Sequence, residues 1–363
     1  MNQARWKNSL RSISRGQWCI IAINILLVLA CVVAVWGLRQ VSATPETTTA
    51  AQRFQGESET RFAQIACFLP VGAGKTQEEI YDFRLALENR FVEESLEAPE
   101  GGSLWIDAYS GSASVRAVTD HGSVEITALG VGGDFFHFHP LRLRSGVYIS
   151  ERDLMDDLVL LDEETAWRLF GGFDLAGMPL EINGKPFVVA GVVAMEDDFA
   201  SKRAMRQEGG LFLSYSALKR LNEELVIDCY EIVLPDPISG YAAGMVETLF
   251  AKKDGEVVEN SGRYTAMRLV DVVRSFGERS MRTSAVVYPY WENALRLRED
   301  YAALLLLAAV MLALCPVLSV AVVTIRLIRA AVRTVRQSVP VWVENRIERH
   351  REKKLAAGKT EGE

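Results

Sequence analysis

The amino-acid sequence predicts a membrane protein with two transmembrane helices and an α+β extracytoplasmic domain, in which a discontinuous α/β lobe carries an inserted β-rich lobe. Three observations predict this class. Two long blocks near the chain ends are almost free of charge, the segment between them is strongly acidic, and its apolar residues follow helical and strand periods in turn. With 363 residues, of which 49% are hydrophobic, the chain is too apolar to be disordered.

The first block, WCIIAINILLVLACVVAVWGL at residues 18–38, predicts a transmembrane helix after a cytoplasmic N-terminus at 1–17. At about 1.5 Å per residue it is long enough to cross a hydrocarbon core of about 30 Å. A cleaved signal peptide ending at Val41-Ser42-Ala43 is the alternative, but its apolar core is usually only about 7–15 residues long. We therefore favour a retained anchor. Residues 39–60 are polar without an apolar period and predict a linker.

The extracytoplasmic domain, residues 61–285, is expected to open with a β-α-β unit. Strands are predicted at 61–69 and 103–110, with a helix at 77–93 between them. The helix would bury one face, formed by Ile80, Phe83, Leu87 and Phe91. This order is typical of a layered α/β fold.

Short strands then dominate and predict the inserted β-rich lobe. They are expected at 123–131, 148–151, 158–162, 179–185 and 186–194. Asn183-Gly184 is a hairpin signal, and a short helix at 163–171 should end at Gly171-Gly172. After Gly210 the α/β character returns, with strands at 211–215 and 229–235 and helices at 240–253 and 265–280.

A stalk is expected at 286–301. Its helix should follow Pro289 and continue into the second span, AALLLLAAVMLALCPVLSVAVVTI at 302–325. Pro316 is interpreted as a tolerated kink rather than a functional hinge. A basic cytoplasmic tail at 326–363 follows.

Charge sets the expected orientation. Residues 1–17 carry four basic residues and no acid, residues 324–363 carry ten basic and five acidic, and the remainder carries 26 basic and 42 acidic. Because Lys and Arg beside a span stay on the cytoplasmic side, both termini should be cytoplasmic in a two-pass cell-membrane protein. The acidic centre argues against nucleic acid as a partner.

The five cysteines divide by location. Cys19, Cys31 and Cys315 lie in the spans as small apolar fillers. Cys67 and Cys229 fall outside, each in a predicted strand, where a disulfide is possible and two buried thiols fit equally well.

No motif in the outer segment predicts an active site. GAGKT at 72–76 resembles the end of a phosphate-binding loop, but Leu69 occupies the position of its first glycine, so we expect a strand-to-helix turn with Thr76 as N-cap. His137 and His139 could form a metal pair, and two polar residues on an edge strand is the favoured alternative. Acidic groups at 156–157, 163–164 and 196–198 lack EF-hand spacing. We therefore predict no enzyme activity, no catalytic residue, no metal and no cofactor.

The tail carries the one candidate contact site. Arg326, Arg329, Arg333 and Arg336 fall at spacings of three, four and three, which places them on one helical stripe. Such a basic amphipathic helix can bind anionic membrane lipid or a partner, and an ordinary positive flank is the alternative.

A series of turn glycines, acidic loop positions and apolar residues recurs at characteristic spacings over residues 124–192. Its positions are Asp134, Phe136, Gly146, Asp153, Ala166, Leu169, Phe170, Gly171, Asp174, Gly177, Ile182, Gly184, Phe187, Val189, Gly191 and Val192. This series resembles the extracytoplasmic core of the MacB-type, FtsX-like permeases of ABC transporters. They are turn glycines and apolar core residues, so they specify a fold rather than a catalytic site. The resemblance is weaker over the rest of 61–285, and it also covers the first span and the stalk.

The resemblance implies a permease whose outer domain is moved by a cytoplasmic ATPase. Family members have three spans after the outer domain, whereas one follows here. It therefore implies a non-catalytic subunit or accessory of an ABC-type complex, with a separate ATPase, a larger permease chain or a second copy as partners. A stand-alone membrane-anchored binding or sensing module is the alternative.

Overall fold

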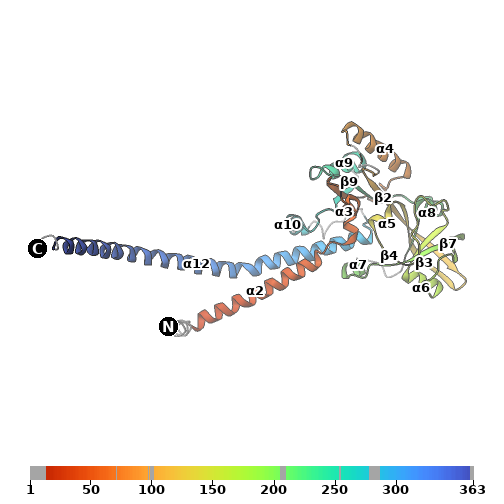
Figure 1. The fold of residues 1–363 in the computed structure, drawn as a ribbon. Helices are drawn as coiled ribbons and strands as arrows, with labels where there is room; N and C mark the ends of the chain where they lie inside the picture. Colours follow the sequence, from red (N-terminus) through yellow and green to blue (C-terminus); the bar gives the residue numbers. More distant parts are fainter. Residues whose placement is uncertain are drawn as a thin grey trace. The chain divides into compact units, whose positions relative to one another are not determined.

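The structure is a computed structural model that describes residues 14–70, 72–96, 98, 102–204, 210–252, 255–277 and 287–359. The side chains of residues 334 and 336–359 are outside the description. The chain divides into two compact units, a membrane unit of Met1–Arg39 with Leu304–Glu363 and an outer unit of Gln40–Ala303. Each is considered by itself (Figure 1).

Two helices in the described residues are long and apolar enough to cross a membrane, at Arg15–Val41 and within Tyr290–Arg333. The first is α2 (Arg15–Val41), and the second belongs to α12, a single helix over Tyr290–Lys359. The two helices approach each other in the membrane unit, where the Cys31 thiol lies 3.5 Å from the carbonyl oxygen of Ala309. The two predicted apolar spans are confirmed as candidate membrane helices.

The outer unit is built on one ten-stranded sheet in the order β10-β1-β9-β2-β3-β8-β5-β7-β4, with β6 pairing both β2 and β7. Among the pairs formed by the described strands, only β3-β8 and β5-β7 are parallel. The strands are β1 (Phe62–Phe68), β2 (Ile106–Thr119), β3 (Gly122–Gly133), β4 (Arg142–Gly146), β5 (Leu158–Asp162), β6 (Pro179–Ile182), β7 (Lys185–Ala194), β8 (Gly210–Ser214), β9 (Cys229–Pro235) and β10 (Glu256–Glu259).

Short helices accompany the sheet. They are η1 (Glu46–Thr48), α3 (Ala50–Gln55), α4 (Gln77–Glu93), α5 (Phe135–Phe138), α6 (Glu163–Phe170), α7 (Phe199–Ala204), α8 (Tyr215–Leu221), α9 (Tyr241–Val246), the π-helix η2 (Glu247–Ala251) and α10 (Ala266–Arg274).

The sheet is buried on both faces, each of which carries an apolar cluster. Strand β1 contributes to both clusters because its successive side chains point to opposite sides. Ile65 and Cys67 of β1 belong to one apolar cluster, with the buried residues of α4, α6, α8 and α9. Ala66 and Phe68 belong to a second cluster, with α3, α5 and Trp291 of α12. We call these two sides the α4 face and the α12 face.

The predicted β-α-β opening is confirmed, and α4 has the predicted bounds. Its start is fixed by a capping box, in which Thr76 accepts from the Glu79 N–H and Glu79 accepts from the Thr76 N–H. Ile80, Phe83, Leu87 and Phe91 are its buried residues, as the helical period predicts.

The local signals of the inserted region are also confirmed. Asn183 and Gly184 both have positive φ, at 48° and 76°, which is the conformation that a two-residue β6-β7 hairpin requires. Helix α6 begins with the Asp162 side chain accepting from the Thr165 N–H at 2.7 Å and ends at Gly171 in the left-handed conformation.

The structure differs from the sequence-based expectation at three places. Residues 39–60, predicted as a polar linker, contain the end of α2, η1 and α3. Helix α3 packs on β1, and Ala50 donates its N–H to the buried Gln64 side chain at 3.1 Å. Residues 148–151 form no strand. Strand β8, expected in the α/β lobe, pairs with β3 and β5 of the inserted region. The long β2-β3 hairpin joins the two regions into one sheet.

Candidate functional site at the start of α12

The predicted arginine stripe lies on α12. Arg326, Arg329 and Arg333 are exposed on the helix, and the side chain of Arg336 lies outside the described residues. Their spacing on one continuous helix is as the sequence predicts, whereas a role in binding lipid or a partner remains a proposal.

Cys67 and Cys229 are free, buried thiols. They lie on the neighbouring antiparallel strands β1 and β9, where Cys67 is opposite Tyr230 and Cys229 is opposite Phe68. Since the pairing is displaced by one residue, Cys67 faces the α4 side and Cys229 faces the α12 side. Of the two alternatives that the sequence leaves open, the structure contains two thiols, and the sheet separates them.

The histidines do not lie on an edge strand, because FFHF forms the short helix α5. His137 contacts the Ala50 carbonyl oxygen through Nε2 at 3.2 Å, while His139 is buried and paired with Glu231. Among the residues that the structure describes, no three His, Cys, Asp or Glu side chains are grouped to hold a metal ion.

The GAGKT segment serves the fold. A Cβ on Gly74 would lie 2.3 Å from a methyl carbon of Val226, so only glycine lets this loop pass the chain before β9. Lys75 then forms an isolated β-bridge with Ile227. The predicted turn with Thr76 as N-cap is confirmed.

A buried network of charged residues surrounds the first turns of α12. The Arg263 guanidinium donates to both carboxylate oxygens of Glu292 at 2.8 Å each and to Oε1 of Glu299 at 2.6 Å. It also donates to the Asn260 side chain at 3.1 Å. Arg263, Glu292 and Glu299 expose only 4%, 0% and 5% of their surface. This bidentate geometry is the strongest form of an arginine–carboxylate pair.

Arg296 extends the network to the edge strand β10. Its Nε donates to Glu292 at 2.6 Å, and its terminal NH2 group donates to Glu256 of β10 at 2.7 Å. The guanidinium carbon also lies 3.9 Å from the centre of the Tyr288 ring, a cation–π distance. Tyr288 in turn donates its hydroxyl to Glu256.

Burial and charge oppose each other in this network. Burial alone raises the pKa of Glu292, but Arg263 and Arg296 offset it and hold that pKa below its ordinary value. Burial likewise lowers the pKa of Arg263, and Glu292 and Glu299 more than reverse the shift. Glu292 is therefore ionised at neutral pH, and each charge depends on its partners.

A second contact lies on the α12 face of the sheet. Trp291, in the first turn of α12, packs on His139 with ring centres 4.4 Å apart and on Phe135 at 5.8 Å. His139 is joined to Glu231 of β9 through Nε2 at 2.5 Å. Trp291 is thus linked to strand β9 through His139, which contacts both Trp291 and Glu231.

A third contact ties the next turn of α12 to the segment around α7. Arg298 pairs with Asp198 at 2.8 Å, and Tyr301 accepts a hydrogen bond from Arg203 at 2.9 Å. Asp198 also accepts from the N–H groups of Ala200 and Ser201, so it caps α7. The acidic group at 196–198 therefore includes a cap and an ion pair rather than a metal ligand set.

Sequence reasoning did not identify this network. Its signal is the spacing of Glu292, Arg296 and Glu299, which places the three side chains on one face of the predicted stalk helix. The partner, Arg263, lies in a turn 29 residues earlier than Glu292, and only the fold brings the two together.

A family profile described as MacB-like periplasmic core domain matches residues 19–240. Three solved structures are similar to the chain. The periplasmic region of MacB from Actinobacillus actinomycetemcomitans has 18% identity and a TM-score of 0.40, and the match covers 64% of this chain and 100% of that one. The extracellular domain of the noncanonic ABC-type transporter YknZ from Gram-positive bacteria has 15% identity and a TM-score of 0.37, with coverage of 54% and 99%.

The third structure is a domain of a putative permease protein from Porphyromonas gingivalis, with 13% identity and a TM-score of 0.32. That match covers 59% of this chain and 97% of the other. No curated protein matches the chain.

Proposed function

Because the chain belongs to the family of proteins with a MacB-like periplasmic core domain, we propose that it is a non-catalytic membrane subunit or accessory of an ABC-type transporter or mechanotransmission complex. It couples the motion of a separate cytoplasmic ATPase to its extracytoplasmic domain. The family match and the two apolar helices support a membrane transporter component, and the coupling is our proposal.

The observation that carries the coupling is the buried network of Arg263, Glu292 and Glu299. Glu292 and Glu299 belong to α12, the helix whose later residues form the second apolar span. Breaking such a buried pair costs about 3–5 kcal/mol. A displacement of the start of α12 would therefore move the outer sheet with it, because the ion pairs hold until that energy is supplied.

In this proposal both termini are cytoplasmic and the outer unit is extracytoplasmic, in agreement with the basic flanks of the two spans. Fusing a reporter that fluoresces only in the cytoplasm to either terminus tests the orientation. Fluorescence from both fusions is expected, and a dark fusion at either end would contradict it.

The proposed contact with the ATPase, or with a larger permease chain, is the stripe of Arg326, Arg329, Arg333 and Arg336. The test is a mild-detergent pull-down of the full chain followed by identification of bound proteins. We expect an ABC ATPase to co-purify, and its recovery to fall at least tenfold when all four arginines are changed to glutamine.

A matched variant changes the same four arginines to lysine. Since lysine keeps the positive charge but loses the planar fork, it separates attraction to anionic groups from bidentate pairing. Loss of the ATPase with glutamine and its return with lysine would assign the contact to charge. Recovery of an intact chain without any ATPase would overturn the proposed function.

A second candidate function, an anchored binding or sensing module, is favoured by one loop of the inserted region. Glu151 fixes the loop by accepting from the Tyr109 hydroxyl at 2.9 Å and the Gly133 N–H at 2.7 Å. Leu154 nevertheless exposes its whole side chain, and Met155 is exposed beside it. Specific capture of an extracytoplasmic protein that Leu154→Asp abolishes, without any ATPase, would favour this candidate.

A further inference from the structure

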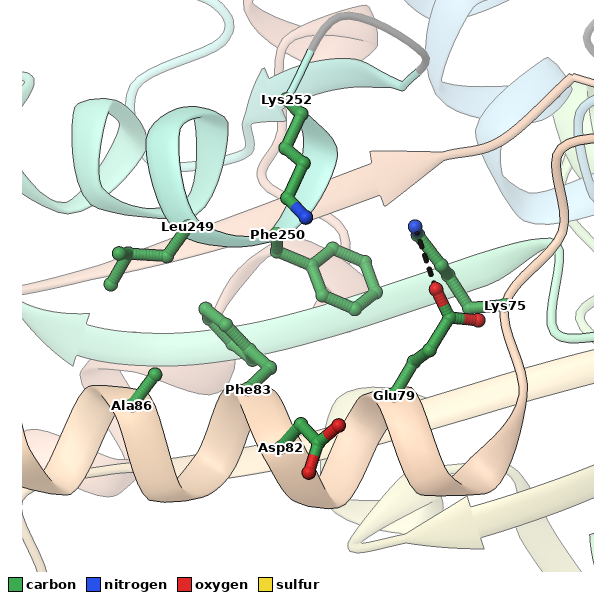
Figure 2. A pocket seen from close by; sticks show the side chains of 8 residues that line it. All are labelled: Lys75, Glu79, Asp82, Phe83, Ala86, Leu249, Phe250 and Lys252. Atoms are coloured by element: carbon green, nitrogen blue, oxygen red, sulfur yellow. Dashed lines mark hydrogen bonds and ion pairs between the residues drawn. The ribbon is translucent and has the colours of Figure 1, made fainter.

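On the α4 face, a small hollow lies between α4 and the π-helix η2 (Figure 2). Its volume is about 250 Å³, and its lining is formed by Lys75, Glu79, Asp82, Phe83, Ala86, Leu249, Phe250 and Lys252. This volume is just below the range of about 300–1,000 Å³ that is typical of drug-sized ligands. The hollow therefore suits a molecule of roughly ten heavy atoms.

The backbone beside the hollow is irregular. Helix α9 widens into η2, and the Lys252 N–H donates to the Glu247 carbonyl oxygen five residues earlier at 2.8 Å. This π-turn ends the helix, a place where such turns commonly occur.

Lys252 has an unfavourable backbone conformation, with φ 52° and ψ −113°. Gly56 has nearly the same angles, φ 52° and ψ −122°, where it ends α3. A side chain in this region costs about 1–3 kcal/mol, so glycine would be the more stable residue at position 252.

Lys252 places its ammonium over the hollow, on the same side of the Phe250 ring as the ammonium of Lys75 (Figure 2). Lys75 is already paired with Glu79 at 3.0 Å, and Glu79 also accepts from the Thr76 N–H at 3.0 Å. No ion pair joins Lys252 to a residue in the described part of the chain. The Lys252 charge acts on Glu79 only from a distance, where it helps to lower the pKa of that carboxyl. A lysine without an ion pair in the described residues and a strained backbone thus occur together at the rim.

We propose that the hollow is a binding site for a small amphiphilic anion, with one carboxylate or phosphate between Lys75 and Lys252 and a short apolar body over Phe83, Leu249 and Phe250. Asp82 on the same rim disfavours a second negative charge on the body. The site lies on the α4 face, away from the network at the start of α12, so it does not depend on the proposed coupling function.

The experiment titrates the full chain in detergent with 3-phenylpropanoate, observed by ligand NMR. Its neutral and cationic counterparts are 3-phenylpropan-1-ol and 3-phenylpropylammonium. We expect the carboxylate to bind with a Kd of about 1–10 mM, as its size allows, and the other two to bind at least tenfold more weakly. Equal binding of the alcohol or the ammonium compound would overturn the proposal.

Two variants at one position separate charge from strain. Lys252→Ala removes the ammonium and keeps the strain, whereas Lys252→Gly removes both. Each should weaken 3-phenylpropanoate at least fivefold, and only Lys252→Gly should also raise the Tm, by about 2–4 °C. Lys202→Ala, at an exposed lysine of α7, is the control and should change neither value. An unchanged Kd in Lys252→Gly would overturn the site.

The source of the anion is distinguished by competition. Dihexanoylphosphatidylglycerol that displaces the probe would support a lipid headgroup as occupant. Displacement by phenyl phosphate alone would support a soluble anion. Failure of every anionic probe to bind saturably would overturn the proposal.

Discussion

The two faces of the outer sheet hold their helices by apolar packing and paired charge in different proportions. On the α4 face, α4 is held by four buried apolar side chains and one partly buried pair, in which Arg84 donates twice to Asp107 at 2.8 Å. On the α12 face, the start of α12 is held by Trp291 and by the network of Arg263, Glu292 and Glu299. Apolar packing is tolerant of position, whereas paired charges must keep their geometry to remain paired. The difference indicates that a small displacement of the helix would disturb more of its contacts with the sheet at α12 than at α4.

The largest expected effect is that of Arg263→Met. It leaves Glu292 and Glu299 buried with fewer partners, and it should lower the free energy of unfolding of the outer unit by about 3–5 kcal/mol. Urea denaturation of the full chain in detergent, followed by tryptophan fluorescence, measures it. Replacing Arg263, Glu292 and Glu299 together with methionine should recover most of the loss, because no charge is then left unpaired. If Arg263→Met had the same free energy of unfolding as wild type, the network would contribute nothing to the stability of the outer unit.

Leu87→Ala tests the other face. Leu87 is fully buried on α4, and its truncation should cost about 3 kcal/mol through lost burial and a cavity. Leu85 on the same helix is 60% exposed, so Leu85→Ala is the matched control and should stay within about 0.5 kcal/mol of wild type. Equal losses in the two variants would contradict the assignment of the buried stripe.

The two faces should respond to pH with opposite signs. Burial raises the pKa of Asp228, beside Tyr215 on the α4 face, to about 6. The folded state therefore keeps a proton that the unfolded chain loses near pH 4, and stability falls as pH rises from about 4 to 6. Asp228→Asn should be more stable than wild type at pH 7, by up to about 2 kcal/mol, and equal to it at pH 4. A pH-independent difference would contradict this reasoning.

On the α12 face the sign is reversed. Because Arg263 and Arg296 offset burial and lower the pKa of Glu292, its contribution is fully present above the unfolded pKa of about 4.3. It is lost as pH falls through the lower folded value. Glu292→Gln should therefore have a lower free energy of unfolding than wild type at pH 7, and this difference should shrink at pH 3. Parallel urea titrations at the two pH values would detect the change.

Smaller effects concern local features. Thr76→Ala removes the N-cap of α4 and should cost about 1 kcal/mol. Thr60→Ala, where the hydroxyl is not part of a helix cap, is the control. An equal loss in both variants would show that the capping box contributes nothing of its own.

The smallest expected effect is that of a reductant. Since Cys67 and Cys229 are free and on opposite sides of the sheet, dithiothreitol should leave the Tm unchanged. Thiol labelling of the unreduced, denatured chain should modify both cysteines. Protection of the pair before reduction would contradict the strand register.

Local signals predicted much of this fold, because they act between residues close in sequence. The capping box at Thr76, the hairpin at Asn183-Gly184 and the apolar stripe of α4 are of this kind. The pairing of β1 with β9 and β10 and the approach of Arg263 to Glu292 depend on contacts across the fold. Residues 39–60 were predicted to be a linker because the buried contacts of this segment are made by small residues such as Thr47 and Ala50, which carry no apolar period.

The proposed coupling between a separate ATPase and the outer sheet is tested most directly by hydrogen exchange on a complex purified with that ATPase, compared with and without ATP. We expect exchange in β10 and the adjoining turn at Arg263 to change with nucleotide. The change should be absent in the variant with methionine at positions 263, 292 and 299, whose ATPase still turns over. Exchange that is the same in every nucleotide state of the wild-type complex, during normal ATP turnover, would contradict the coupling.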